Sequence, residues 1–351
     1  LIEELFWLRS WTEETYLWND EVTDQDPNNF SDRLAHFNVL KTNAVEPSGE
    51  DRDDFHFSQS TEDFLASRNS VGNPGYGTSF SVLRGAPPRD IRVAYTEPGS
   101  PAETPIAGVV PFPRGAKVLE VDGTSVVNGF TTSAEVSRLN TLLFAPETIG
   151  ETHEFVVEDA DGTVRTFDIT TADISRKPVL TTEVITTPTG QVGYILFNTF
   201  SPFSSEEEII LAMQDMRTAG VSDLVLDLRY NGGGLVSIAE LMGDLMGRNT
   251  VGQVFSRTVL RPSKAAQNDT EFFEGVSQSI APTKIAIIGR GGTASASELV
   301  TNSMIPYLGS NIALVGANTS GKPVGQFGFD LAACDDRIRA VTFKTENRDG
   351  N

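Results

Sequence analysis

The sequence predicts an α+β protein of several domains: a helical N-terminal region over residues 1–73, a mainly β domain over 74–175 and an α/β domain over 176–351. Three observations predict this division. Apolar residues recur at helical spacing near the start, short strand-like runs alternate with turns in the middle, and strands alternate with helices afterwards. A chain of 351 residues has room for two or three domains of ordinary size.

The N-terminal region is predicted to be helical because apolar residues stand three or four positions apart, among them Leu1, Leu5, Leu8 and Trp11. A polar and acidic stretch over 43–54 indicates a loop. The run from Gly72 to Gly77 holds three glycines and a proline, which is typical of a domain boundary.

The middle domain is predicted from short runs rich in β-branched and aromatic residues. Asp122-Gly123 and Asp161-Gly162 are hairpin-type turns between such runs, and Ser133–Phe144 is the one strong helix. The predicted strands are Thr78–Leu83, Ile91–Tyr95, Lys117–Val121, Thr152–Glu158 and Thr163–Ile169.

The last part of the chain alternates strands and helices, which predicts layers of helix against sheet. One helix begins at Ser204 or Ser205 and runs through Met216, and another covers Ser237–Met246. The predicted strands are Gly193–Phe197, Leu224–Leu228, Lys284–Ile288 and Ile312–Val315.

Composition excludes several function classes. The formal net charge of −21 argues against nucleic acid and against anionic lipid, because both would repel such a surface. The sequence contains no run of about 18 apolar residues, which is the length that a membrane-spanning helix needs. The single cysteine, Cys334, cannot form a disulfide within the chain. The chain opens on Leu1 rather than Met, so we expect that an upstream segment has been removed.

The histidines restrict the catalytic chemistry that is open to the chain. His36, His56 and His153 all precede the predicted α/β domain, so that domain alone cannot hold a Ser-His-Asp triad. Use of His153 from the middle domain stays open as an alternative. No histidine, cysteine or carboxylate cluster has metal-ligand spacing, so we expect neither a metal nor another cofactor.

Ser295 stands in the turn Gly291–Glu298, between the apolar strand Lys284–Ile288 and a helical stretch. Free backbone N–H groups at a helix N-terminus stabilise a developing negative charge, and the small residues around Ser295 leave room for a carbonyl group. Serine and alanine are also ordinary residues at helix starts, so this turn alone does not establish catalysis.

Two further segments contain residues suited to catalysis. Asp227–Gly234 ends a buried strand in three glycines, which permit close approach of the backbone to a ligand. Lys322 is the one lysine of the α/β domain in a glycine-flanked loop after a probable core strand. Burial can lower the pKa of a lysine towards neutrality, and such a lysine serves as a general base.

Together, these three segments resemble the carboxyl-terminal processing peptidases, also called tail-specific proteases. That family carries an Asp-Leu-Arg-x-Asn-x-Gly-Gly strand end, an Ala-Ser-Ala-Ser-Glu turn and a Gly-Lys loop. Here the same motifs stand in order at Asp227–Gly234, Ala294–Glu298 and Gly321-Lys322. The resemblance covers residues 75–351 well and the first 70 residues only loosely.

The resemblance implies a role for each matching residue. Ser295 matches the nucleophile, Lys322 the general base, and Gln326 the glutamine that orients the lysine in some members. The N–H groups of Ala296 and of the glycine loop match the oxyanion hole. Within that loop, the resemblance favours Gly234 and then Gly233. The expected function is cleavage of protein or peptide substrates through an acyl-enzyme.

The middle domain resembles a PDZ domain in the segments Glu97–Ala102 and Lys117–Gly123. Such domains capture substrate C-termini by adding the peptide to a sheet edge. Thr78, Ser79 and Phe80 lie in the best candidate for the peptide-binding segment. The catalytic part resembles the crotonase-type fold of stacked ββα units.

Two residues depart from the family pattern: Pro323 follows Lys322, and Pro306 stands where some relatives carry an acidic residue. Both resemble a branch of exported bacterial members that includes lipoproteins. The resemblance therefore implies a periplasmic or cell-envelope location and leaves open a lipid anchor upstream of Leu1. It also implies a final segment beyond Asn351.

Two alternatives stay open. One is a catalytically latent, PDZ-bearing scaffold that binds peptides, which a structure with Ser295 and Lys322 out of hydrogen-bond reach would favour. The other is a CoA-binding enzyme of the crotonase type, which lacks support because no acidic pair stands at the glycine loops.

Overall fold

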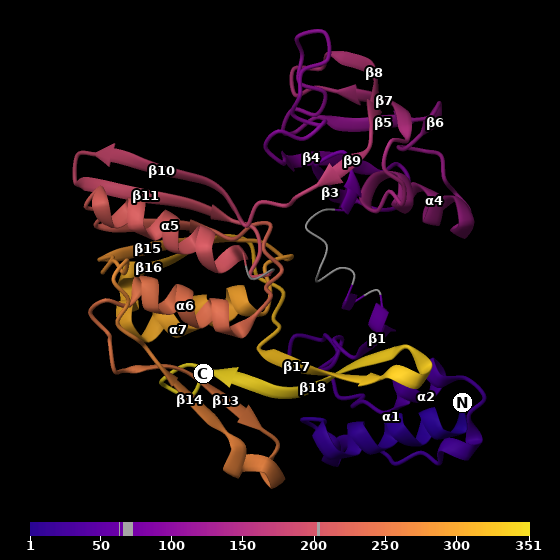
Figure 1. The fold of residues 1–351 in the computed structure, drawn as a ribbon, viewed down its shortest axis with the longest axis vertical. Helices are drawn as coiled ribbons and strands as arrows, with labels where there is room; N and C mark the ends of the chain where they lie inside the picture. Colours follow the sequence, from indigo (N-terminus) through magenta and orange to yellow (C-terminus); the bar gives the residue numbers. More distant parts are fainter. Residues whose placement is uncertain (63, 66–72, 202–203) are drawn as a thin grey trace. The chain divides into compact units, whose positions relative to one another are not determined.

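A computed structural model describes residues 1–62, 64–65, 73–201 and 204–351 of the chain. It divides into two compact units, one of residues 69–177 and one that joins residues 1–68 to residues 178–351 (Figure 1). The sequence predicts residues 1–73 as a region of its own. In the structure, the described residues up to position 65 share a unit with residues 178–351, and Asn73 belongs to the other unit.

The unit of residues 69–177 is built on an antiparallel sheet with the strand order β3-β4-β5-β7-β8, in which β6 pairs with β5. All five predicted strands are confirmed within two residues at either end, and the helix α4 lies at Ser133–Phe144 as predicted. The short strands β2 and β9 pair separately. The strands are β2 Asn73–Gly75, β3 Thr78–Arg84, β4 Asp90–Thr96, β5 Lys117–Val121, β6 Thr124–Ser125, β7 Thr152–Glu158, β8 Val164–Thr170 and β9 Ala172–Ile174.

The core of this unit is aromatic. Phe112 meets Phe155 and Phe167 edge to face, with ring centroids 5.2 and 5.1 Å apart. Leu139 of α4 is buried against the same cluster. Strand β3 has one neighbour in its sheet, β4, so it is an edge strand of that sheet within the described part of the chain.

The larger unit contains a sheet with the order β10-β11-β12-β15-β16, in which β11, β12, β15 and β16 are parallel. Because the carboxyl ends of parallel strands meet at one edge, the loops after β12, β15 and β16 lie together. The strands are β10 Val179–Thr187, β11 Gly190–Phe197, β12 Asp223–Asp227, β15 Lys284–Gly289 and β16 Ile312–Gly316. The helices are α5 Ser204–Thr218, α6 Val236–Met246 and α7 Ala296–Leu308. The predicted α/β character of this part is therefore confirmed.

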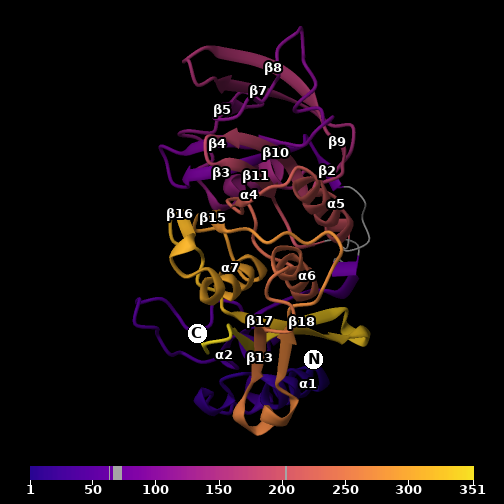
Figure 2. The ribbon, with the colours of Figure 1, turned by 90° about the vertical axis from the view of Figure 1, so that its left-hand side faces the viewer.

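A second sheet of the larger unit was not predicted. It has the order β1-β18-β13-β14, and β17 also pairs with β18. Both views place α6 and α7 between this sheet and the parallel one (Figure 1 and Figure 2). The strands are β1 Phe57–Ser60, β13 Val254–Leu260, β14 Asp269–Phe272, β17 Val324–Leu331 and β18 Asp336–Glu346.

The N-terminal region packs onto this second sheet. Helices α1 (Ile2–Thr15) and α2 (Arg33–Val39) confirm the helical prediction. Leu5, Leu8 and Phe37 pack on Ile338 of β18. Strand β1 pairs directly with β18, so the first and last parts of the chain form one sheet. Five 3-10 turns complete the described structure: η1 Asn19–Glu21, η2 Pro27–Asn29, η3 Pro262–Gln267, η4 Gly309–Asn311 and η5 Ala332–Cys334.

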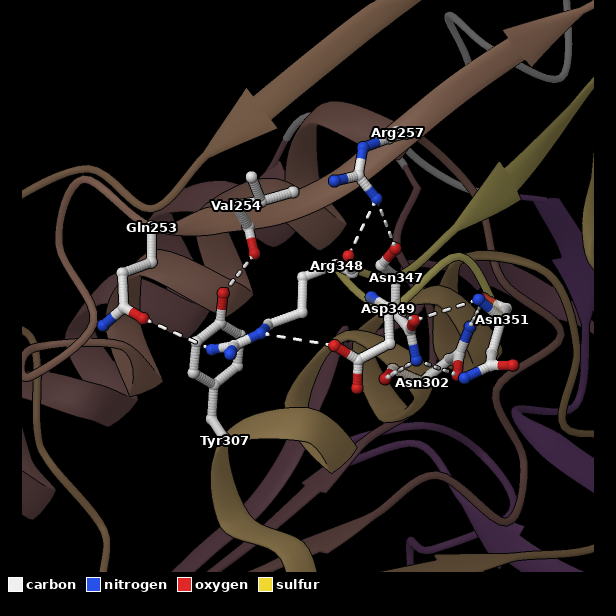
Figure 3. A network of polar contacts seen from close by, with 9 residues as sticks. All are labelled: Gln253, Val254, Arg257, Asn302, Tyr307, Asn347, Arg348, Asp349 and Asn351. Carbon is white, nitrogen blue, oxygen red and sulfur yellow. Dashed lines mark hydrogen bonds and ion pairs between the residues drawn. The ribbon is translucent and has the colours of Figure 1, made fainter.

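A polar network fixes the end of β18 to α7 (Figure 3). Arg257 of β13 donates to the carbonyls of Asn347 and Arg348, and the Asn347 amide donates to Asn302 of α7. The helix that follows the Ser295 turn is therefore held against the second sheet. None of the helices that the structure describes combines the length and apolarity needed to cross a membrane.

Candidate active site

Ser295 occupies a strained turn between β15 and α7. Its φ is +57° and its ψ is −116°, a conformation that residues with a side chain rarely adopt. Such strain costs on the order of 1–3 kcal/mol and persists only where the surroundings enforce it. Here the flanking residues are bound to the glycine loop, since Ala294 N and Ser297 Oγ both donate to the carbonyl of Asn231. The turn presents a half-buried Ser295 at the N-terminus of α7.

The glycine loop after β12 packs directly against this turn. The buried Asn231 side chain donates to the carbonyl of Phe197 and accepts a 2.9 Å hydrogen bond from Gly233 N. A Cβ at Gly233 would lie 2.8 Å from the Cβ of Ser295, so only glycine fits.

The backbone N–H groups beside Ser295 separate into bound and free ones. Gly233 N–H is committed to Asn231. Within the described residues, the N–H groups of Gly234 and Ala296 have no hydrogen-bond acceptor. Of the three residues predicted for the oxyanion hole, Gly234 and Ala296 therefore have donors available, and Gly233 instead fixes the loop.

Lys322 lies in the loop between β16 and β17. Its Nζ donates a 2.8 Å hydrogen bond to Gln326 Oε1 and stands 4.9 Å from the centre of the Phe55 ring. Gln326 Nε2 in turn donates to the carbonyls of Phe55 and Arg339. Lys322 and Gln326 are thus brought together as predicted, with two further residues that the sequence did not indicate.

The environment lowers the pKa of the Lys322 amine below its ordinary value. Burial is the largest cause, because it removes water from the ammonium form, and the guanidinium of Arg339 acts in the same direction. The carboxylates of Asp53 and Glu298 oppose the change only in part. A lysine with a lowered pKa is suited to accept a proton from a nucleophile.

Glu298 joins the two loops. Its carboxylate accepts hydrogen bonds from Ser295 N at 2.8 Å and from Lys322 N at 2.9 Å through Oε2. Through Oε1 it accepts bonds of 2.7 Å from Thr319 Oγ1 and Gly321 N. The motif around Ser295 includes Glu298, but no role for this residue was predicted from the sequence. Its position three residues after Ser295, where an acidic residue caps a helix start, was the available signal.

The side chains of Ser295 and Lys322 make no direct hydrogen bond within the described residues. Among the described residues, no hydrogen bond links Ser295 Oγ to the Lys322 amine, which is instead bonded to Gln326. Catalytic hydrogen bonds in unliganded enzymes are often long and tighten when substrate binds. The geometry therefore gives an assembled pair of loops in which the final contact is not made.

A cavity of about 600 Å³ opens beside the same loops. Its lining includes the polar residues Glu298 and Thr319, Gly321, and the apolar residues Ile305 and Leu314. Ser295 and Lys322 do not line it. Nowhere in the described residues do three or more histidine, cysteine or carboxylate side chains gather in a way that could hold a metal ion.

The residues predicted to bind peptide lie on the edge strand β3 of the other unit. Thr78 and Ser79 line a small hollow of about 60 Å³, which Leu143 and Phe144 border from the α4 side. Phe80 points instead to the aromatic core, where it meets Phe112 edge to face at 5.7 Å.

Comparisons with known proteins identify the family to which the chain is similar. Residues 191–351 match the sequence profile of peptidase family S41. A carboxyl-terminal-processing protease of Picosynechococcus sp. is 30% identical over 248 residues, which is 69% of this chain and 53% of that protein. A chloroplastic C-terminal processing peptidase of Tetradesmus obliquus is 28% identical over 267 residues, 70% of this chain and 50% of that protein. The chain thus spans about half the length of these curated relatives.

Solved structures share the fold. An S41 protease of Bacteroides fragilis superimposes with a TM-score of 0.72 at 22% identity, over 98% of this chain and 86% of that one. The photosystem II D1 C-terminal processing protease superimposes with a TM-score of 0.58 at 20% identity, over 100% of this chain and 89% of that one.

Replacing Glu298 by alanine is expected to release the loop that holds Thr319, Gly321 and Lys322 from the Ser295 turn. Hydrogen exchange at the amides of Gly321 and Lys322 should speed up by about tenfold or more, because both lose their acceptor. Mass spectrometry of the peptide that covers residues 317–323 measures this change. Glu135→Ala is the matched control, since Glu135 also accepts backbone N–H bonds at a helix start but lies in the other unit. Unchanged exchange at 317–323 in Glu298→Ala would contradict the bridging role.

Proposed function

Since the chain belongs to the carboxyl-terminal processing peptidases of family S41, we propose that it is a serine endopeptidase with Ser295 as nucleophile and Lys322 as general base. One observation carries the proposal: Glu298 accepts hydrogen bonds from the backbone N–H groups of both residues. The lowered pKa of the Lys322 amine supports it. Acyl transfer requires a nucleophile and a nearby general base whose pKa lies close to the working pH.

The proposed reaction follows from the donors at the site. Neutral Lys322 takes the Ser295 proton as Oγ attacks the substrate carbonyl carbon. The oxyanion that forms accepts hydrogen bonds from the N–H groups of Gly234 and Ala296. Collapse of this intermediate breaks the peptide bond, and the Lys322 ammonium returns its proton to the leaving amine. Water then hydrolyses the acyl-enzyme by the same steps.

Gln326 gives the lysine a direction in this scheme. A neutral amine has two N–H donors and one lone pair. Donation to Gln326 Oε1 uses one donor and leaves the lone pair available for the Ser295 proton. Because Gln326 Nε2 donates to two backbone carbonyls, its Oε1 is the atom that faces Lys322.

The unit of residues 69–177 is proposed to act as a PDZ-like module that captures substrate C-termini. Three features support this role: the position of β3 at the edge of its sheet, the hollow between β3 and α4, and the glycine loop before β3. A peptide that adds as a strand to such an edge gains backbone hydrogen bonds, and its carboxylate meets the loop N–H groups. The substrates are therefore proposed to be proteins or peptides with exposed C-terminal tails.

The layers of the larger unit support a crotonase-type architecture for the catalytic part. The parallel strands β11, β12, β15 and β16 alternate along the chain with α5, α6 and α7. Export to the periplasm or cell envelope, with a lipid anchor as one means of attachment, is part of the proposal and rests on the resemblance to exported members alone.

A catalytically latent peptide-binding scaffold is the second candidate. The observation that favours it is the amine of Lys322 bonded to Gln326, with no bond to Ser295 among the described residues. Retention of Ser295, Lys322 and Gln326 together favours the active enzyme. Measuring cleavage decides between the two candidates.

Cleavage of casein and of apolar-tailed peptides is expected to depend on Ser295 and Lys322. Ser295→Ala and Lys322→Ala should each lower kcat/KM by about 10³-fold or more, since the nucleophile or its activation is lost. Lys322→Arg should not rescue, because a guanidinium stays protonated. The exposed Lys344 supplies the control variant Lys344→Ala, which should keep full activity.

The pH dependence of kcat/KM tests whether Lys322 is the general base. Only neutral Lys322 accepts a proton, so activity should rise with pH through the lysine pKa. Because burial and Arg339 lower that pKa, the rise should lie below the ordinary lysine value of about 10.4. Equal residual cleavage by wild type and Ser295→Ala would refute the peptidase assignment.

Tail capture is expected to need both a free peptide carboxylate and the loop before β3. In the Ser295→Ala background, fluorescence anisotropy should show that amidation of the peptide C-terminus weakens binding by about tenfold or more. Gly77→Ala should do the same, because its φ is +81° and a Cβ there would lie 2.1 Å from that of Ser100. Gly99→Ala is the matched control, with a φ of +73° and open space around its Cβ. Tight binding of the amidated peptide would exclude carboxylate recognition.

A further inference from the structure

We propose that Phe55, in the N-terminal region, is a positioning residue for the general base Lys322. Its carbonyl orients the glutamine that holds the amine, and its ring covers the amine. The inference rests on the proposed function, in which Lys322 is the base. It also assigns the N-terminal region a part in catalysis.

The backbone of Phe55 sets the orientation of Gln326. The carboxamide of glutamine can point either its oxygen or its nitrogen at a neighbour, and the surrounding network decides which. The carbonyl of Phe55 accepts from Gln326 Nε2, and so does the carbonyl of Arg339 at 3.3 Å. With the nitrogen committed to two carbonyls, Oε1 is turned to accept from Lys322 Nζ at 2.8 Å.

The ring of Phe55 lies over the amine itself. Lys322 Nζ stands 4.9 Å from the ring centroid. A ring in this position has two opposing effects. Its negative face favours the ammonium form, which raises the lysine pKa. Its bulk keeps water from the amine, which lowers that pKa.

On this proposal, exclusion of water outweighs the attraction between the ring and the ammonium form. Burial is the leading cause of the lowered lysine pKa in this site. Other charged groups act on the amine from three further elements: Asp53 from the N-terminal segment, Glu298 from α7 and Arg339 from β18. The two carboxylates raise the pKa and the guanidinium lowers it. Loss of the ring should therefore let water in and raise the pKa of Lys322.

The segment that carries Phe55 is firmly held. The buried carboxylate of Asp53 accepts from Phe55 N at 2.9 Å and from the hydroxyl of Tyr16 at 2.6 Å. Lys41 Nζ donates to the carbonyl of Asp53 at 2.6 Å. The next side chain, His56, stacks on Phe37 with ring centroids 3.9 Å apart. Phe55 is thus placed by buried contacts on both sides along the chain.

Pairing with the C-terminal strands brings this segment to the base. Strand β1 begins two residues after Phe55, where Phe57 pairs with Arg339 of β18. Gln326 lies on the neighbouring strand β17, opposite Val341. Lys322 and Gln326 are therefore contacted by the ring and carbonyl of Phe55 and by the carbonyl of Arg339. Phe55 comes from the first part of the chain and Arg339 from the last, and these two parts meet in one sheet.

The pH dependence of cleavage tests the proposal in the full-length chain. Phe55→Ala should move the rising limb of kcat/KM up by about one pH unit, which is a loss of about tenfold at neutral pH. Phe55→Leu keeps an apolar cover over the amine and should move the limb by less than half as much. Phe57→Ala is the control, because Phe57 lies in the same segment with 43% of its surface exposed. An unshifted limb in Phe55→Ala would overturn the proposal, even if the variant were less stable or less active.

A second measurement reads the lysine without requiring activity. Lysine labelled with ¹³C at Cε is titrated by NMR in Ser295→Ala and in Ser295→Ala with Phe55→Ala, and Lys322→Arg identifies the signal. The proposal predicts a higher pKa for Lys322 when Phe55 is absent, and equal values would contradict it. If the wild type shows no Ser295-dependent cleavage, the peptidase function is refuted. The titration would still test whether Phe55 lowers the pKa of Lys322, because it does not depend on cleavage.

Discussion

The carboxylate of Glu298 is the interaction on which the site depends. Four donors converge on it: the backbone of Ser295, the backbone of Gly321 and Lys322, and the hydroxyl of Thr319. The first belongs to the turn after β15 and the others to the loop after β16, so one side chain joins two loops that strand order alone would leave independent. The positive φ of Ser295 is sustained in part by this bond, because the strained residue has its N–H fixed.

Around this bridge, each neighbouring segment limits what the others can do. Gly233 packs against Ser295 and donates its N–H to Asn231, which leaves the N–H groups of Gly234 and Ala296 without an acceptor among the described residues. Phe55 of the N-terminal region lies over the amine of Lys322, the proposed base. A lysine in water would stay protonated near neutral pH, so its proposed role depends on that cover. The proposed nucleophile thus follows a strand of the parallel sheet, and residues of the second sheet surround the proposed base.

Local pattern in the sequence was enough for much of the fold. The helix at Ser133–Phe144 and the strands of the parallel sheet show their own periodicity, and three ordered motifs indicated Ser295 and Lys322. The second sheet escaped prediction because its pairings join distant segments. Phe55 and Gln326 are 271 residues apart, so nothing near either residue signals the contact. The different roles of Gly233 and Gly234 depend on where the Asn231 side chain points, which a run of three glycines does not reveal.

The central claim is that Ser295 is a nucleophile that Lys322 activates, and covalent labelling tests it most directly. A fluorophosphonate reacts with an activated serine hydroxyl, and intact-mass spectrometry counts the adducts while peptide mapping locates them. We predict one adduct on Ser295 in the wild type, none in Ser295→Ala, and labelling slowed by about 100-fold or more in Lys322→Ala. An adduct that forms equally in Ser295→Ala, or a Lys322→Ala variant labelled at the wild-type rate, would contradict the account.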